Sequence, residues 1–361
     1  MARKLKWDKV LFIATLLLVA GSIVMVYSAA AAYGPALFLT KQAMWAALGL
    51  VALLLAMRID YHEYTRPAVI WSLLGFTALA LVAVLFRTQV GGSRRWFGIG
   101  PIGIQPSEFA KLVTVVFVAA VLERRMKRID EPIFALTPVG IVVGMFAALI
   151  LLEPDFGSAT ALAAIAVVMV FAAGLAYRYL AGFALCALPL VASVLWLSPY
   201  RRKRVLAFLD PWQSPLGDGF QVIQSFIAVG TGGVSGKGLS QGVQKLKGYL
   251  PAPHTDFIYS VIAEELGLIG ATVVLACFCV IAWRGLMIAR RAPDSVGALL
   301  AVGLTTMVAV QAFINISVVL GLLPTKGIAL PFVSAGGSSL LVNMLGVGIL
   351  LNVSQQASAS Q

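Results

Sequence analysis

The segment Pro251-Ala-Pro-His-Thr-Asp-Phe257 and the apolar run behind it, Ile258 to Trp283, decide how this chain is interpreted. The run is long enough to cross a bilayer, which takes about 20 apolar residues. Asp256 lies two residues before this run, and Glu264 and Glu265 lie about two helical turns further along it. Carboxylates are costly to bring into a membrane, so they are usually paired or functional. Asp256 is therefore the residue around which the other polar groups are considered.

The composition predicts an all-α polytopic membrane protein. Of the 361 residues, 60% are hydrophobic and 12% are charged, and the mean hydropathy is +0.94. A soluble domain of this length does not need so much apolar surface. The net charge of +12 is accounted for by basic loops beside anionic lipid or by an anionic substrate, so nucleic-acid binding is not predicted.

Apolar segments predict a single domain, residues 1–361, with ten transmembrane helices. They lie near residues 9–30, 38–57, 67–87, 107–124, 133–152, 156–176, 179–198, 257–284, 296–322 and 338–356. Ten spans place both termini on one side, and short basic loops on that side predict that it is cytoplasmic. A long extracytoplasmic loop, about 199–255, joins helices 7 and 8. The polar tail, about 354–361, is expected to be disordered.

Polar groups gather on the predicted outer face, beginning with Arg94, Arg95 and Trp96. Arginine forks suit a phosphate or pyrophosphate, and tryptophan suits a sugar face. The alternative is that these residues anchor the chain at the lipid interface. Either role places them at the outer membrane surface.

Two further elements carry charges at this face. Glu108 and Lys111 are three residues apart on a predicted helix, so they either form a structural ion pair or line a cavity. Asp155 follows Pro154, and it either caps the next helix or contributes charge to a site.

The long loop contains a basic run and a glycine run. Arg201-Arg-Lys-Arg204 is expected to adhere to lipid headgroups, and 220–229 is expected to be helical. Gly230-Thr-Gly-Gly-Val-Ser-Gly-Lys-Gly238 lacks the spacing of a nucleotide-binding loop, and it favours a lid or a re-entrant segment.

Asp256 is predicted to be functional, although it could also cap the following helix. Partial burial raises the pKa of a carboxyl group and makes it a better general base. Glu264 lies about 80° and Glu265 about 180° from Asp256 around a helix. Glu264 is therefore expected near Asp256, and Glu265 is expected to pair with a neighbouring span. Lys326 lies in a Gly- and Pro-rich segment and is expected to face an anionic ligand.

These motifs together resemble the SEDS family (shape, elongation, division and sporulation), which includes FtsW, RodA and SpoVE. The resemblance extends nearly end to end. It is dense at Gly92-Ser-Arg-Arg-Trp96, Gln105-Pro-Ser-Glu-Phe-Ala-Lys111, Glu153-Pro-Asp-Phe-Gly157, His254-Thr-Asp-Phe257, Glu264-Glu-Leu-Gly267 and 315–339. Gly321-Leu-Leu-Pro-Thr-Lys-Gly327 is more similar to FtsW or SpoVE than to RodA. Ala335 departs from the family, which usually has Tyr there.

The resemblance implies a peptidoglycan glycosyltransferase that polymerises lipid II into β-1,4-linked strands, with inversion, during cell division. Undecaprenyl diphosphate would be the leaving group, and the outer face of the bacterial cytoplasmic membrane the place of reaction. Asp256 matches the family's essential aspartate and is the predicted catalytic residue. The predicted substrate-binding residues are Arg94, Arg95, Trp96, Glu108, Lys111, Asp155, His254, Glu264, Lys326 and Ser338. The predicted partners are lipid II, a class B penicillin-binding protein transpeptidase and membrane lipids.

Three alternatives stay open at this stage. The chain could be a RodA-like elongation polymerase, a lipid II flippase or other transporter, or a scaffold without catalysis. A transporter should spread its polar groups across the bilayer, whereas those of this sequence crowd toward one face. No cofactor is certain, metal ligands are unknown, and a requirement for a divalent cation (Mg or Mn) is left open.

Overall fold

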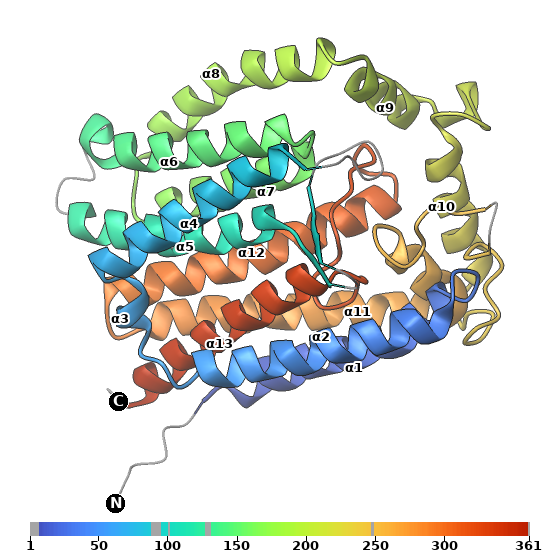
Figure 1. Cartoon of the computed structure of the whole chain (residues 1–361), viewed down its shortest axis with the longest axis horizontal. Coiled ribbons are helices and arrows are strands. Elements are labelled where there is room, and N and C mark those ends of the chain that lie inside the picture. The colour runs from blue at the N-terminus through green and yellow to red at the C-terminus, as the bar shows by residue number, and fades with distance from the viewer. Residues whose placement is uncertain (1–6, 88–94, 100–101, 127–130, 247–248, 360–361) are drawn as a thin grey trace, which may run out of the picture.

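The computed structural model describes residues 7–87, 95–99, 102–126, 131–246 and 249–359. It is a bundle of long helices lying side by side, as Figure 1 shows. The long helices are α1 (Lys9–Ala29), α2 (Pro35–Ala56), α4 (Pro67–Leu85), α5 (Pro106–Arg125), α6 (Pro132–Leu152), α7 (Phe156–Ala172), α8 (Tyr177–Trp196), α11 (Ile258–Arg291), α12 (Ser295–Val319) and α13 (Gly337–Ala359). Each falls on a segment that the sequence predicts to be a span, so the all-α polytopic class is confirmed.

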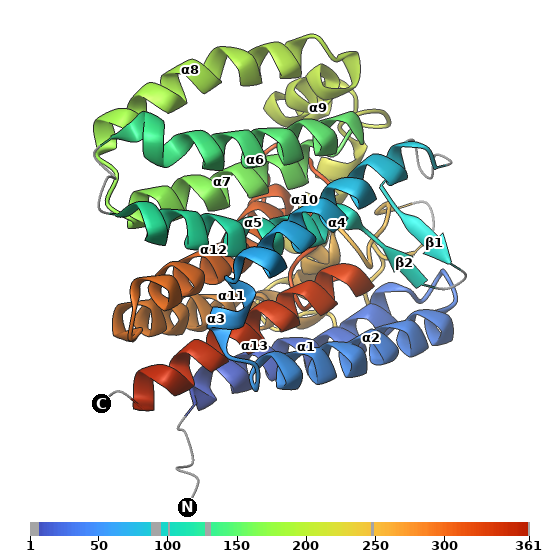
Figure 2. The same cartoon turned by 60° about the vertical axis from the view of Figure 1, so that its left-hand side comes forward.

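Within the described ranges, six helices are long and apolar enough to cross a membrane, namely α1, α2, α4, α11, α12 and α13. The apolar stretches of α6 and α7 are shorter, and α5 carries several charges. The count of ten spans therefore stays a prediction. The start of α1 and the end of α13 lie at the same end of the bundle, as an even number of spans requires (Figures 1 and 2).

The smaller elements divide between the two ends of the bundle. A single turn, α3 (Tyr61–Tyr64), lies at the end with the termini. At the other end lies a hairpin of β1 (Phe97–Ile99) and β2 (Ile102–Ile104), antiparallel with Gly98 opposite Gly103. The long loop contains α9 (Pro199–Leu209), a 3-10 turn (Pro211–Gln213) and α10 (Phe220–Gly232). The hairpin is absent from the sequence prediction, whereas the helix expected at 220–229 is confirmed.

The core runs along α5, α12 and α13, where most side chains are buried. From Pro106 to Ala120 every residue of α5 except Phe109 is buried. α5 therefore lies in the middle of the bundle, although it carries Glu108 and Lys111.

The C-terminal tail differs from the prediction of disorder for about 354–361. α13 continues as a helix to Ala359 because its last turns are packed and hydrogen-bonded. The Ser354 hydroxyl, itself buried, accepts a hydrogen bond of 3.2 Å from the Asp8 N–H. Asn352 accepts one of 3.0 Å from the Tyr61 N–H.

α11 is kinked at Gly267, whose φ of 65° and ψ of −163° are not helical. The loop 233–238 completes the broken hydrogen-bond ladder. Leu268 and Ile269 donate their N–H groups to the carbonyls of residues 233 and 234, at 2.9 and 3.2 Å. The N–H groups of residues 237 and 238 donate to the carbonyls of Glu264 and Glu265, at 3.0 and 2.9 Å. The glycine run is thus fixed to the helix and is not a free lid.

The side chains of Glu264 and Glu265, both fully buried, bind residues 237–245 of the long loop. Glu264 accepts hydrogen bonds from Lys237 Nζ at 2.7 Å and from two loop N–H groups. Glu265 pairs with Lys245 Nζ at 2.5 Å and accepts from the Ser28 hydroxyl of α1. The expected contact of Glu265 with a neighbouring span is present as the Ser28 hydrogen bonds, but its ion-pair partner comes from the loop. The two lysines explain part of the basic charge of the loop.

We predict that Glu265→Ala destabilises the fold strongly, because it leaves the Lys245 ammonium buried without its carboxylate. Breaking a buried ion pair typically costs about 3–5 kcal/mol. The measurement is thermal unfolding of the purified protein in detergent. The matched control is Glu63→Ala, which removes an exposed carboxylate paired with Arg66 and should cost less than about 1 kcal/mol. Equal shifts in the two variants would contradict this account.

Candidate functional site

Asp256 is held in place by its main chain. It directly precedes α11, and its carbonyl accepts a hydrogen bond of 2.9 Å from Asn315 Nδ2 of α12. The same nitrogen donates to the Ile328 carbonyl at 2.8 Å. One residue away, the Thr255 carbonyl accepts from the Ser334 hydroxyl at 2.7 Å. The loop between α12 and α13 is therefore bound directly to the backbone that presents Asp256.

Arg95 and Asp256 both lie next to Gly327 of that loop. A Cβ atom built on Gly327 would lie 3.2 Å from Asp256 Oδ2 and 3.8 Å from Arg95 Nη1. These two side-chain atoms are therefore at most about 7 Å apart, the sum of those two distances. A side chain at position 327 would contact both groups, so a glycine there leaves the space between the acid and the guanidinium open.

Arg95 is fixed against the link between α6 and α7. Its guanidinium donates to the carbonyls of Glu153, at 3.3 Å, and of Pro154, and its Nη1 lies 4.0 Å from Asp155 Oδ1. The Arg95 side chain is only 22% exposed. Its positive charge is therefore held among these groups and is not directed into bulk water. Asp256, Arg95, Glu153 and Asp155 are called the cluster below.

Asp155 fills both roles that the sequence left open for it. It caps α7 by accepting hydrogen bonds from the Ser158 N–H at 3.1 Å and the Ser158 hydroxyl at 2.8 Å. Its Oδ2 also accepts from Gln105 Nε2, at 3.1 Å, just before α5 begins. Being next to Arg95, its charge contributes to the cluster as well.

The environment of Asp256 suits a proton acceptor. Burial raises the pKa of Asp256 to about 6, while Arg204 and Arg95 lower it and Asp155 raises it. A carboxyl group with this pKa is mostly ionised at pH 7 and still basic enough to take a proton.

Arg204 is a site residue that sequence reasoning missed, since its basic run was assigned to lipid headgroups. From α9 it donates to the Thr325 carbonyl at 3.2 Å and acts on the charge of Asp256. Nearby, Lys326 Nζ lies 4.6 Å from the centre of the Phe156 ring, and burial lowers the pKa of Lys326. The segment around Lys326 thus receives Arg204, which acts on Asp256, while the ammonium of Lys326 itself lies on the Phe156 ring.

Glu153 is a second missed residue, although its motif was noted. It is fully buried, and neither carboxylate oxygen has a hydrogen-bond partner in the part of the chain that the structure describes. Burial, reinforced by Asp155 and opposed by Arg95, raises the pKa of Glu153 to about 8. The signal that could have identified it is a second acid two residues before Asp155, in a tight turn.

Glu108, Lys111 and Ser338 are buried inside the bundle. Lys111 Nζ is 2.7 Å from Glu108 Oε1 and donates to Gln311 Oε1 at 2.6 Å. The structural ion pair expected for Glu108 and Lys111 is present, and Glu108 Oε2 has no partner among the described residues. The Ser338 hydroxyl accepts from the Gln105 N–H at 3.3 Å.

The contacts given for the remaining predicted residues are with groups other than Asp256, and one of these residues lies outside the described ranges. His254 packs against Phe38 and Tyr33, with ring centres 4.4 and 5.5 Å away, and burial lowers its pKa. Trp96 covers Gly103 of the hairpin. The contacts of Glu264 are those with the loop given above, and Arg94 lies outside the described residues. Substrate binding by these residues stays a prediction.

A divalent cation finds no ready-made site in this cluster. Across residues 7–359, excluding the ranges not described, no group of three or more His, Cys, Asp and Glu side chains could hold a metal ion. Asp155 and Glu153 lie next to Arg95, whose charge disfavours a second cation there. We therefore derive no step through a metal ion.

The fold and this cluster define a multi-pass membrane protein with a buried polar site at one end of its helical bundle. The chain belongs to the cell cycle protein family of FtsW, RodA and SpoVE, whose profile matches residues 8–359.

Comparison with individual proteins gives the same result. The chain is 42% identical to "Probable peptidoglycan glycosyltransferase FtsW" of a Geobacter species, over 96% of each protein. It is 42% identical to stage V sporulation protein E of Bacillus subtilis, over 98% of each. A solved structure named "Structural coordination of polymerization and crosslinking by a peptidoglycan synthase complex" matches 98% of this chain and 99% of its own, with a TM-score of 0.82 and 33% identity. Thermus thermophilus RodA matches with a TM-score of 0.72 and 28% identity, covering 98% of both chains.

We predict that Glu153→Gln makes the protein less sensitive to alkaline pH. A carboxyl group whose pKa rises from 4.5 to about 8 on folding keeps its proton in the folded state and loses it on unfolding. It therefore lowers stability as pH rises through that range. Thermal unfolding at pH 5 and pH 8 should show the variant gaining on the wild type only at pH 8. The matched control is Glu131→Gln, at an exposed glutamate. A gain that is the same at both pH values would rule out a neutral Glu153.

Proposed function

We propose that this protein is a peptidoglycan glycosyltransferase that polymerises lipid II into β-1,4-linked glycan strands, with Asp256 as its general base. The observation that carries the proposal is that the side chains of Asp256 and Arg95 both lie next to Gly327. A partly buried acid next to fixed cations suits proton removal beside a leaving anion. The names of the relatives, among them FtsW, support this reaction and a role in cell division.

The reaction would be a single displacement at the anomeric carbon of the donor sugar. Asp256 takes the proton of the acceptor 4-hydroxyl, and that oxygen bonds to C1 of the donor. The bond from C1 to the pyrophosphate breaks, and undecaprenyl diphosphate leaves with the bonding electrons. Attack from the opposite face turns an α-linked donor into a β-1,4 product.

The cations around Asp256 would stabilise the charge that develops on the leaving group. Arg95 and Arg204 both act on the charge of Asp256, and Lys326 lies in the segment that precedes Gly327. Groups held in place before the reaction stabilise a developing anion without the cost of reorganising solvent. A pyrophosphate with two charged groups suits several cations better than one.

The membrane placement and the partner are part of the same proposal. The positive-inside rule supports cytoplasmic termini, which would put Asp256 outside the cytoplasmic membrane, where lipid II is consumed. A class B penicillin-binding protein would crosslink the strands. A solved relative named for polymerization and crosslinking by a synthase complex supports this pairing.

We predict that Asp256→Asn lowers the rate of glycan formation by about 10²–10⁴-fold, the usual contribution of general-base catalysis. The assay incubates the purified protein, together with its transpeptidase, with labelled lipid II and resolves the polymer by electrophoresis. The matched control is Asp218→Asn, at an exposed aspartate of the same loop, which should keep the wild-type rate.

Three other results would overturn the proposal. If Asp256→Asn forms polymer at the normal rate, Asp256 is not the general base. Movement of a fluorescent lipid II analogue across vesicles by the wild type, without polymer, identifies a transporter. Cell division that persists with Asp256→Asn as the only copy favours a scaffold.

We also predict that kcat/KM falls as pH drops through about 6, because the Asp256 base is then protonated. Arg204 lowers the pKa of Asp256, so Arg204→Gln should move this acid limb to higher pH. Arg202→Gln, at an exposed arginine of the same helix, should leave the limb in place. A limb that does not move in Arg204→Gln assigns the titration to another group.

A further inference from the structure

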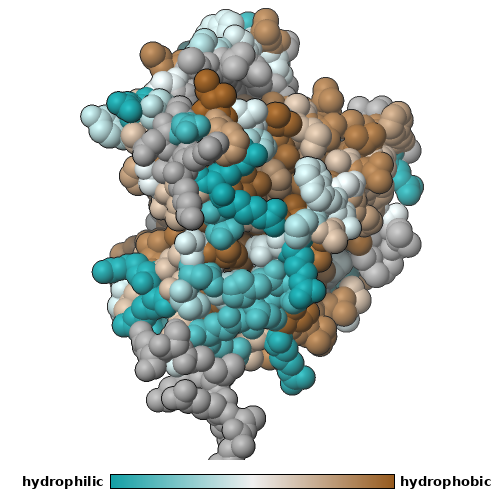
Figure 3. Space-filling view, turned by 90° about the vertical axis from the view of Figure 1, so that its left-hand side faces the viewer, coloured by the Kyte–Doolittle hydropathy of each residue, from teal (hydrophilic) through white to brown (hydrophobic). Residues whose placement is uncertain are grey.

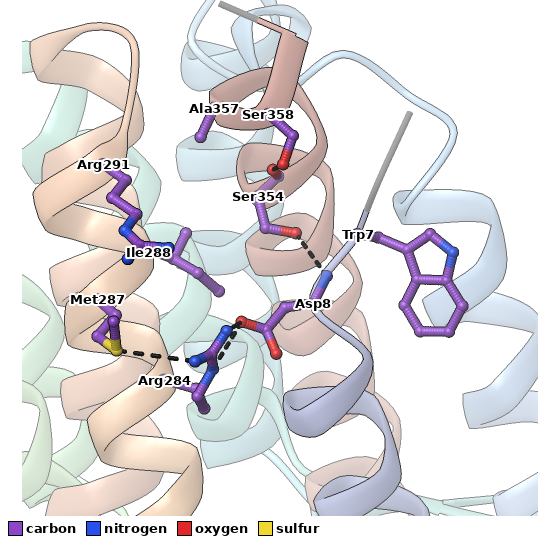
Figure 4. A pocket seen from close by; sticks show the side chains of 9 residues that line it. All are labelled: Trp7, Asp8, Arg284, Met287, Ile288, Arg291, Ser354, Ala357 and Ser358. Atoms are coloured by element: carbon purple, nitrogen blue, oxygen red, sulfur yellow. Dashed lines mark hydrogen bonds and ion pairs between the residues drawn. The ribbon is translucent and has the colours of Figure 1, made fainter. Parts of the chain in front are cut away.

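A pocket opens at the end of the bundle that carries both termini, far along α11 from Asp256. It lies between the start of α1, the end of α11 and the end of α13, and its volume is about 120 Å³. Figure 4 shows side chains from all three helices directed toward it. None of them belongs to the site around Asp256.

One arginine of the pocket is already neutralised. Arg284 Nη2 and Nε lie 2.5 and 2.8 Å from Asp8 Oδ2. Asp8 also caps α1 by accepting from the Leu11 N–H at 3.0 Å, and its own N–H binds Ser354. The Asp8–Arg284 pair therefore has a structural role, since it connects α1, α11 and α13.

The second arginine, Arg291, is two turns further along α11 than Arg284 and lines the same pocket. In the described part of the chain it has no hydrogen-bond or ion-pair partner. Because Asp8 cancels Arg284, Arg291 leaves the pocket with one net positive charge. A guanidinium without a partner favours a phosphate or another oxyanion.

The rest of the lining combines the hydroxyls of Ser354 and Ser358 with apolar side chains. Met287 and Ile288 form one side. Trp7 lines the opening and packs edge-to-face against Phe12, with ring centres 5.0 Å apart. Tryptophan is typical of the membrane–water interface. Figure 3 shows hydrophilic residues gathered over this end of the molecule and hydrophobic residues beside them. A ligand here meets a cation and an apolar wall together.

We propose that this pocket binds the phosphodiester of an anionic phospholipid, with its phosphate on Arg291 and its glycerol backbone against Met287 and Ile288. Basic pockets between transmembrane helices are a recognised kind of site for anionic headgroups. The apolar wall favours a lipid over a free phosphate ion, and the single unpaired cation favours an anionic lipid over a zwitterionic one. The site is independent of the proposed reaction, and its test measures binding alone.

The experiment counts lipids retained by the purified full-length protein. The protein is titrated with phosphatidylglycerol or phosphatidylcholine in detergent, and bound lipid is resolved by native mass spectrometry. We expect one phosphatidylglycerol bound in preference to phosphatidylcholine. Arg291→Gln should weaken it about fivefold, as expected for the loss of one basic residue near a lipid surface.

The matched control is Arg290→Gln, which removes the same charge from the neighbouring residue that does not line the pocket. It should bind phosphatidylglycerol as the wild type does. Equal weakening in both variants would mean diffuse attraction and overturn the proposal. Equal binding of phosphatidylcholine would also overturn it, as would displacement of the lipid by inorganic phosphate at the same concentration. Melting temperatures of both variants show whether each remains folded.

Discussion

The burial of two adjacent carboxylates, Glu264 and Glu265, is the constraint on which the rest of the structure depends. A buried carboxylate must be paired. The long loop supplies the partners through Lys237 and Lys245. The kink at Gly267 frees backbone groups at the same level, and the loop backbone satisfies those as well. A hydrophilic segment is thereby fixed to a membrane helix, and it leads directly into Asp256.

The site follows from this arrangement. Asp256 lies where the fixed loop becomes α11, and Asn315 and Ser334 attach the loop between α12 and α13 to the same backbone. That second loop supplies Gly327, next to which Arg95 and the acid both lie. Segments far apart in the sequence thus meet around one carboxyl group. Burial raises its pKa to about 6 against the opposing effect of Arg204 and Arg95. This value is suited to accepting a proton near neutral pH.

Charged groups in this protein fall into two kinds. Glu265 and Lys245, or Asp8 and Arg284, are mutually satisfied and hold helices together. Glu153 and Arg291 lack such partners among the described residues: burial raises the pKa of Glu153 to about 8, and Arg291 lines the pocket between α1, α11 and α13. Residue type alone does not separate the two kinds, because an unpaired group is recognised only when its neighbours are known. The family relationship likewise identifies the chemistry without assigning each residue.

The amino-acid sequence by itself determined the helices, their approximate ends and the importance of Asp256, because apolar length and the cost of a carboxylate in a membrane are local properties. It also carried the motifs of the family. Only the tertiary structure decided that Glu264 holds the loop, that Arg204 acts on Asp256, that Glu153 is buried beside Asp155 and Arg95, and that the helix continues past residue 354. These depend on contacts between distant segments. Helical periodicity places a side chain on a face of its own helix, and it does not say which loop that face will meet.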